Sequence, residues 1–235
     1  MSRRRPQPTL PADQLAIAWQ SLSLLLDYPD KHLVARLPWL RSASHELPAA
    51  VGSPIREAVA GLAQTPLTEL QAAYVDTFDS RRRCNLFLTY FAHGDTRKRG
   101  VALLRFKQTY LRSGYLLDET ELPDHLCVVL EYAATVDQRL GWGLLLDHRA
   151  GLELLRLSLR DSGAVWAPLV EALAATLPPL RGDEWDAVRR LAAEGPPEEE
   201  VGLDPYAGPS FDPALAARTG AAQDLPMPSF PGGRR

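Results

Sequence analysis

The chain of 235 residues has few cysteines and lacks the short motifs of common enzyme classes. Its two cysteines, Cys84 and Cys127, have no metal-ligand spacing and are too few for a disulfide framework, so we expect reduced thiols in a cytoplasmic protein. Phosphate-binding, dinucleotide-binding and nucleophile-elbow motifs are absent. The five histidines never pair at helical metal-binding spacing. We therefore predict a binding protein that is not an enzyme, with no metal site and no cofactor.

Long apolar runs are also missing. No stretch approaches the roughly 20 apolar residues that a membrane span requires. Arg3, Arg4 and Arg5 are followed by prolines and not by an apolar segment, so no secretory signal is expected. The formal net charge of −3 gives no general attraction to nucleic acid. These features predict a protein without stable membrane insertion and without a nucleic-acid partner.

The apolar residues repeat at helical spacing, whereas alternating β-branched residues and Asn-Gly turns are missing. We predict an all-α fold: a single-domain bundle of about eight or nine helices over residues 13–194. Pro38 should kink or shorten the second helix, Gly114 should end the helix that starts after Gly94, and one long helix should span about 143–161. Residues 1–12 and the acidic, proline-rich tail 195–235 are expected to be disordered.

Basic residues gather between Ser80 and Arg112, where there are nine of them and Asp95 is the only acid. Arg97 to Arg99 would lie in the first turn of a helix, where the helix dipole disfavours cations. Such a placement suggests an anionic contact. The candidates are acidic residues elsewhere in the fold, the acidic tail and nucleic acid; the acids considered are Asp76, Asp79, Glu119 and Glu121.

Asp124 and His125 follow Pro123 at a predicted helix start, and two interpretations are open. Asp124 could cap the helix while His125 lies on the surface, or both could contact a ligand. The aromatic residues between Tyr74 and Tyr110 are core residues by default, although helical proteins also bind amphipathic peptides in grooves lined by such side chains.

Taken together, several motifs resemble the NarJ-type (delta subunit) family of respiratory nitrate reductase molybdenum cofactor assembly chaperones. The resemblance covers roughly residues 13–140, and the order and spacing of the motifs match. The matching segments are Leu25 to Asp30, Tyr74 to Asp79, His93 to Gly100, Glu121 to Leu126 and Leu130 to Tyr132.

The resemblance implies an all-helical chaperone of the redox-enzyme maturation class. Such proteins bind the N-terminal peptide of the nitrate reductase catalytic (alpha) subunit in an elongated apolar groove. They promote insertion of the molybdenum cofactor into this client and restrain its premature docking on the membrane subunit. In related chaperones of twin-arginine leaders, an Asp-His pair that matches Asp124 and His125 is linked to peptide binding.

On this basis we predict a peptide-binding site of eight residues. Four would supply apolar contacts in the groove, namely Tyr74, Phe78, Leu88 and Tyr90. Four would set the polar register at its rim, namely Arg97, Arg99, Asp124 and His125. Two other functions remain open: a chaperone for another molybdoenzyme with a twin-arginine leader, and a helical regulator that binds nucleic acid through residues 81–112.

Overall fold

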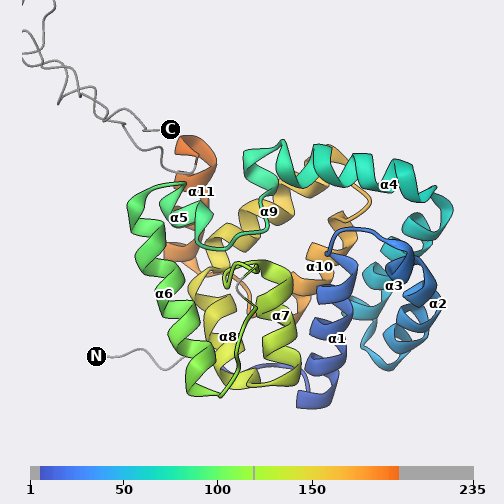
Figure 1. Ribbon diagram of the computed structural model, residues 1–235, viewed down its shortest axis with the longest axis horizontal. Coiled ribbons are helices and arrows are strands. Elements are labelled where there is room, and N and C mark those ends of the chain that lie inside the picture. The colour runs from blue at the N-terminus through green and yellow to red at the C-terminus, as the bar shows by residue number, and fades with distance from the viewer. Residues whose placement is uncertain (1–5, 119, 196–235) are drawn as a thin grey trace, which may run out of the picture. The chain divides into compact units, whose positions relative to one another are not determined.

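The computed structural model describes residues 6–118 and 120–195, and within these residues the chain is all-α, as predicted (Figure 1). No β-strand is found in this part of the chain. Its α-helices are α1 (Ala12–Leu25), α2 (Lys31–Ala43), α3 (Ala49–Gln64), α4 (Leu67–Tyr74), α5 (Tyr90–His93), α6 (Arg97–Arg112), α7 (Leu126–Thr135), α8 (Gln138–Asp147), α9 (Arg149–Ser162), α10 (Ala167–Thr176) and α11 (Gly182–Glu194).

These described residues hold eleven helices, more than the eight or nine expected, for two reasons. The short apolar segment after Cys84 contributes the one-turn helix α5. The helix expected over 143–161 is in fact two helices, α8 and α9, which meet at His148 with a non-helical backbone (φ −113°, ψ 20°). Helix α8 also starts earlier than expected, because the Asp137 side chain accepts a hydrogen bond from the backbone N–H of Leu140 at 2.8 Å and caps it.

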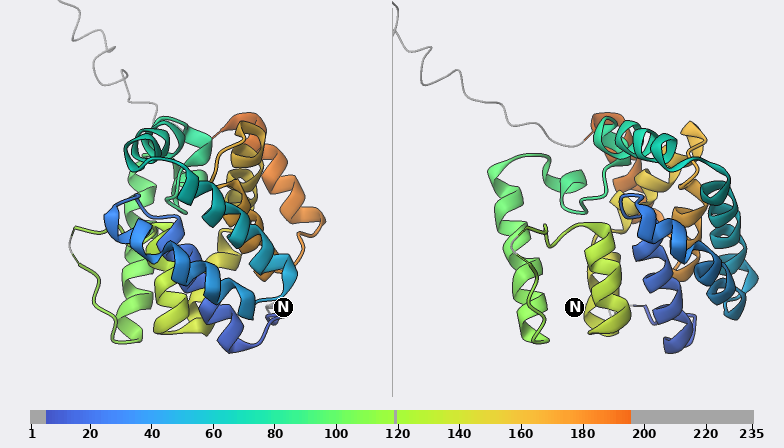
Figure 2. Two further views of the ribbon diagram at one scale, coloured as in Figure 1. Left: turned by 90° about the vertical axis from the view of Figure 1, so that its right-hand side faces the viewer. Right: turned by 45° about the vertical axis from the view of Figure 1, so that its right-hand side comes forward.

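Helix α1 lies in the middle of the fold and packs against α7 and α10 (Figures 1 and 2). The apolar stripe predicted for it is buried, and Trp19 and Leu22 are fully inaccessible. Two hydrogen bonds tie α1 to later parts of the chain. Trp19 Nε1 donates to Thr176 Oγ1 at 3.1 Å, and Ser23 Oγ donates to the carbonyl oxygen of Cys127 at 2.8 Å. The described helices thus share one hydrophobic core.

Helix α2 continues through Pro38 to Ala43, so of the two effects expected of Pro38 the shortening is wrong, and a kink stays a prediction. Pro38 and Val34, the residue four positions earlier, both lie on the exposed side of α2. The Val34 carbonyl, which loses its helical donor at a proline, can therefore be solvated. Asp30 caps α2 as its position suggests, accepting from the Leu33 N–H at 2.7 Å.

The chain ends differ in how much of them is described. Residues 6–11, part of the arm expected to be disordered, lie against the bundle: Trp142 Nε1 donates to the carbonyl oxygen of Pro6 at 3.1 Å, and Leu10 packs on the core. Residues 1–5 and 196–235 lie outside the described residues, and with them almost all of the predicted tail. Gly195, where that tail was expected to start, directly follows α11.

Candidate functional site

Two segments far apart in sequence meet at the predicted site. Residues 86–88, before α5, run antiparallel to residues 124–126, before α7, in an isolated β-bridge between Phe87 and His125. The Leu88 N–H donates to the Asp124 carbonyl at 3.0 Å, and the Leu126 N–H donates to the Leu86 carbonyl at 2.8 Å. This pairing places Asp124 and His125 directly beside the short apolar segment that leads into α5.

The carboxylate of Asp124 is fully buried and binds the start of α5. Its Oδ2 accepts from the Thr89 backbone N–H at 3.2 Å and from Thr89 Oγ1 at 2.5 Å. Residue His125 is the N-cap of α7, and no side chain caps that helix. The expectation that Asp124 caps α7 is therefore wrong, because its carboxylate accepts hydrogen bonds from Thr89 at the start of α5.

Arg99 and His125 both contact the Phe87 ring. The guanidinium carbon of Arg99 is 5.2 Å from the Phe87 centroid, and the His125 ring is 5.1 Å away from it, edge to face. Burial lowers the pKa of His125, so this imidazole is neutral at pH 7. Three of the predicted rim residues, Arg99, Asp124 and His125, are thus brought together.

Two of the nine basic residues after Ser80, Arg81 and Arg99, pair with acidic residues of the fold, which supports the first of the candidate anionic contacts for these two. Arg99 donates to Asp95 Oδ1 at 2.9 Å and lies 3.7 Å from Asp124 Oδ2. Arg81 donates to Asp76 Oδ2 at 2.6 Å. Glu119, another acid considered for this pairing, lies outside the described residues.

Three buried polar atoms in this cluster have no hydrogen-bond partner among the described residues: Asp124 Oδ1, Arg99 Nη2 and Thr96 Oγ1. A buried polar atom without a partner costs about 1–3 kcal/mol, so such atoms are uncommon in folded proteins. A peptide backbone offers N–H donors and carbonyl acceptors. The carboxylate can accept from an N–H, the guanidinium can donate to a carbonyl, and the hydroxyl can do either. The arrangement is therefore suited to binding polar groups of a peptide.

The four predicted groove residues are buried in the core. Tyr74 donates its hydroxyl to the Leu26 carbonyl at 3.0 Å, and burial raises its pKa. Phe78 packs on Trp166, with ring centroids 5.4 Å apart. Leu88 is 1% exposed, and the Tyr90 hydroxyl accepts from Arg82 Nε at 2.9 Å. Because all four side chains are buried, a peptide could reach them only if neighbouring parts of the chain moved. Their contact with a client stays a prediction.

Arg97 lies apart from these buried residues, exposed at the start of α6. Two residues that sequence reasoning did not single out complete the site. Thr89 holds the Asp124 carboxylate, and Trp166 supports Tyr74 and Phe78. Thr89 could have been noticed as the only hydroxyl-bearing aliphatic side chain in the apolar run 86–91, whereas nothing in the sequence marks Trp166 as a neighbour of α4.

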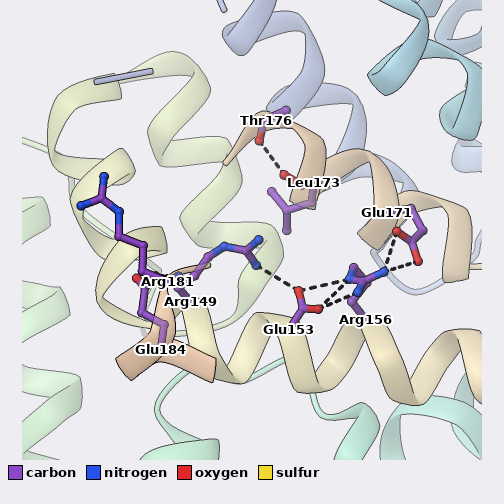
Figure 3. Close-up of polar contacts among 8 residues, drawn as sticks. All are labelled: Arg149, Glu153, Arg156, Glu171, Leu173, Thr176, Arg181 and Glu184. Atoms are coloured by element: carbon purple, nitrogen blue, oxygen red, sulfur yellow. Dashed lines mark hydrogen bonds and ion pairs between the residues drawn. The ribbon is translucent and has the colours of Figure 1, made fainter. Parts of the chain in front are cut away.

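A second buried polar cluster, which sequence reasoning also missed, connects α9 to α10 (Figure 3). Glu153 accepts from Arg156 Nη2 at 2.6 Å and from Arg149 Nη1 at 3.4 Å, and Arg156 Nη1 donates to both oxygens of Glu171. Burial lowers the pKa of Arg149, whereas the hydrogen bond that Arg156 donates to Glu153 raises the pKa of Arg156. The i, i+3 and i+4 spacing along α9 was the available sequence clue.

A hollow of about 500 Å³ opens beside this cluster, bordered by helices α3, α9, α10 and α11. Its two glutamates and two arginines are equal in number, so these four charges sum to zero. Among the described residues no group of three histidine, cysteine, aspartate or glutamate side chains could hold a metal ion. None of the described helices combines the length and apolar character needed to cross a membrane.

The amino-acid sequence of the chain is similar to those of a known protein family. A profile of the family "Nitrate reductase delta subunit" matches residues 44–172, which include all eight predicted site residues. NarJ of Bacillus subtilis is 33% identical over 165 residues, covering 68% of this chain and 88% of NarJ. The nitrate reductase molybdenum cofactor assembly chaperone NarJ of Escherichia coli is 32% identical over 155 residues, covering 65% of this chain and 66% of that protein.

Two further similarities have a narrower meaning. The nitrate reductase-like protein NarX of Mycobacterium tuberculosis is 37% identical over 168 residues, but the chain spans only 24% of its length. A crystal structure described as a redox enzyme maturation protein from Archaeoglobus fulgidus superposes with a TM-score of 0.52 and 22% identity, covering 74% of this chain and 98% of that one. This last similarity supports the fold alone. The NarJ relatives are named as assembly chaperones and not as catalysts, which confirms the expectation that the chain is not an enzyme.

Proposed function

Because the chain belongs to the nitrate reductase delta subunit family, we propose that it is a dedicated assembly chaperone for a nitrate reductase catalytic subunit in the cytoplasm. It binds the N-terminal peptide of that subunit, promotes insertion of the molybdenum cofactor and restrains premature docking on the membrane. The similarity to NarJ chaperones over most of the described helices supports this proposal.

The observation that carries the peptide-binding part is the buried cluster of Asp124, Thr89 and Arg99 with its unpartnered atoms. Asp124 Oδ1 can accept from a peptide N–H, and Arg99 Nη2 can donate to a peptide carbonyl. Each such bond would use a group that is already desolvated in the free protein. Because these atoms are inaccessible in the free protein, a client reaches them only when residues 85–96 move, and its bonds would then offset those that Asp124 loses to Thr89.

The apolar part of the site requires a movement of residues 85–96. This segment carries Leu88 and Tyr90 and is held to the bundle by the β-bridge and by Asp124. A client with an apolar helical face would replace the contacts that the segment loses when it lifts. In this proposal the protein holds the client open for the cofactor and does not bind the cofactor itself.

Calorimetric titration of the full chain with the N-terminal peptide of its cognate catalytic subunit tests the proposal. We expect saturable binding that Asp124→Asn and Arg99→Lys weaken about tenfold or more, since each removes a charge-assisted or forked contact. Arg97→Ala, at an exposed position, provides a site variant with little risk of unfolding. Arg36→Ala on α2 is the matched control, because it also removes an exposed arginine but lies far from the site in sequence.

Two further ligands separate the remaining functions. A twin-arginine leader peptide that binds where the cognate peptide does not would assign the chaperone to another molybdoenzyme. Binding of duplex DNA alone, with steep weakening by salt, would overturn the chaperone proposal in favour of a nucleic-acid-binding regulator. Cognate-peptide binding that none of the three site variants changes would place the client elsewhere on the protein.

A further inference from the structure

The outer face of α6 exposes a row of aliphatic side chains. Val101, Leu104 and Leu111 are 59%, 56% and 58% exposed, although large aliphatic side chains usually pack inside. Their spacing places them within an arc of about 80° on the helix, which also holds the exposed Arg97 and Gln108. The opposite face buries Phe106 and Tyr110 against the bundle. Leu116, which is 79% exposed, follows in the loop after α6.

Exposed cations border this row on both sides. Helical projection places Lys98, Arg105 and Arg112 along one side and Lys107 along the other. Helix α6 contains no aspartate or glutamate. Among the described residues, none of these four cations forms an ion pair. The face therefore combines apolar side chains with positive charge that forms no ion pair within residues 6–118 and 120–195.

Helix α6 is also positioned to present this face outward. It forms one edge of the bundle in Figure 1 and in the right view of Figure 2, with its outer side turned away from the other helices. Its inner side is fixed: the Tyr110 hydroxyl donates to the Pro123 carbonyl at 2.6 Å, and Gly114 (φ 71°) follows the helix end. The helix is already formed, so docking it would cost little ordering entropy.

We propose that this face of α6 docks on a bilayer surface that contains anionic lipid. The helix would lie in the plane of the interface, with Val101, Leu104 and Leu111 at the boundary of the acyl chains. The flanking cations would contact headgroup phosphates. Aliphatic side chains flanked by cations on the outer face of a single helix match the surface of a bilayer that contains anionic lipid, whereas a protein partner would have to supply a groove. This inference is independent of the peptide-binding proposal.

Flotation of the full chain with lipid vesicles tests the docking. One vesicle population contains about one third phosphatidylglycerol in phosphatidylcholine, and the other is pure phosphatidylcholine. We expect binding to the anionic vesicles that decreases with salt. Each neutralised cation, for example Lys107→Gln, should weaken partitioning about fivefold. Leu104→Ser with Leu111→Ser should weaken it about tenfold, also at high salt, where charge attraction is screened.

Helix α2 offers a matched control. Its exposed Val34 and Trp39 lie near the exposed Arg36 and Arg41. Val34→Ser with Trp39→Ser, and Arg36→Gln with Arg41→Gln, remove side chains of the same kinds from another surface and should leave partitioning unchanged.

A fluorescent label gives a second readout of depth. An environment-sensitive dye on Leu104→Cys should shift to the blue when anionic vesicles are added, whereas the same dye on Val34→Cys should not. The natural thiols of Cys84 and Cys127 are 2% and 7% exposed, so labelling will be selective for the introduced cysteine.

Three outcomes would overturn the proposal. One is equal binding of the α6 variants and the α2 controls. A second is salt-dependent binding that Leu104→Ser and Leu111→Ser do not change, which would reduce the face to a general cationic patch. The third is absence of vesicle binding together with loss of cognate-peptide binding in the α6 variants, which would assign the face to a protein partner.

Discussion

Replacing Asp124 by alanine is the most direct test of how the site is held together. The change removes two hydrogen bonds from Thr89 to a fully buried carboxylate. Bonds to a charged group contribute about 1.5–3 kcal/mol each, or roughly 3–6 kcal/mol together. The change also removes the unpartnered Asp124 Oδ1, whose burial costs about 1–3 kcal/mol. Taking the midpoints of these two ranges, the free energy of unfolding should fall by about 2–3 kcal/mol.

Urea denaturation followed by circular dichroism at pH 7 measures this change. In a domain of this size the loss corresponds to a decrease in Tm of roughly 5–15 °C. Asp124→Asn should cost less, because its amide oxygen can still accept from Thr89.

The chain contains a control with the same local chemistry at the surface. Asp118 Oδ1 accepts from the Thr120 N–H at 2.8 Å and from Thr120 Oγ1 at 2.7 Å, but Asp118 is exposed. Water can replace the lost acceptor there, so Asp118→Ala should change the urea midpoint little. If the two alanine variants had the same small effect, burial would not be what gives the Asp124 contacts their strength.

Three other perturbations have defined outcomes. Burial lowers the pKa of His125 in the folded protein, so the unfolded state binds the proton more readily; stability should fall as the pH drops below about 6.5, and His125→Gln should reduce that slope in denaturation curves. Gly141→Ala would put a Cβ 2.3 Å from Ala133 Cβ and should cost about 1–3 kcal/mol in the free energy of unfolding, with only partial rescue by Ala133→Gly because the Ala133 Cα is 2.6 Å away. Arg156→Met leaves Glu153, 2% exposed, with only the weak Arg149 contact and should cost about 3–5 kcal/mol in the same assay.

Each of these expectations has a result that contradicts it. A stability profile that His125→Gln leaves unchanged below pH 6.5 would show that this imidazole does not contribute to the pH dependence. Full stability of Gly141→Ala would mean that α7 and α8 can separate at no cost. Arg160→Met is the control for Arg156, since Arg160 lies on the same helix but is exposed; equal effects of the two would contradict the role given to burial.

Much of the helical framework could be predicted from the sequence. The stripe from Leu15 to Leu26, the Asp30 cap and the Gly114 helix end are local features, and all three are found in the structure. The misassigned break at His148 has a physical reason: apolar residues continue at helical spacing on both sides of it, so periodicity alone cannot show that the backbone leaves the helical region for one residue.

The candidate site was less accessible to sequence reasoning, because its contacts join distant segments. Of the four residues predicted for the rim of the groove, the structure brings Arg99, Asp124 and His125 together and leaves Arg97 apart. The hydrogen bonds from Thr89 to Asp124 depend on a β-bridge between Phe87 and His125, which are 38 positions apart. No local sequence pattern predicts such a contact. Periodicity also indicates only that a side chain such as Phe78 faces other apolar groups. It does not tell a groove that a client fills from a core that Trp166 fills.

The central position of α1 has a consequence for how the protein is made. Trp19 donates its hydrogen bond to Thr176, 157 residues later, and α1 is buried against α7 and α10, which leave the ribosome long after it. At bacterial and eukaryotic synthesis rates this delay is roughly 8 to 30 s. Helices α2 and α3 follow α1 directly and contact it, but during that time the surface of α1 that packs against α10 has no permanent partner on the growing chain. A nascent assembly chaperone is therefore itself vulnerable to aggregation, and its folding is completed only when nearly the whole helical domain has been synthesised.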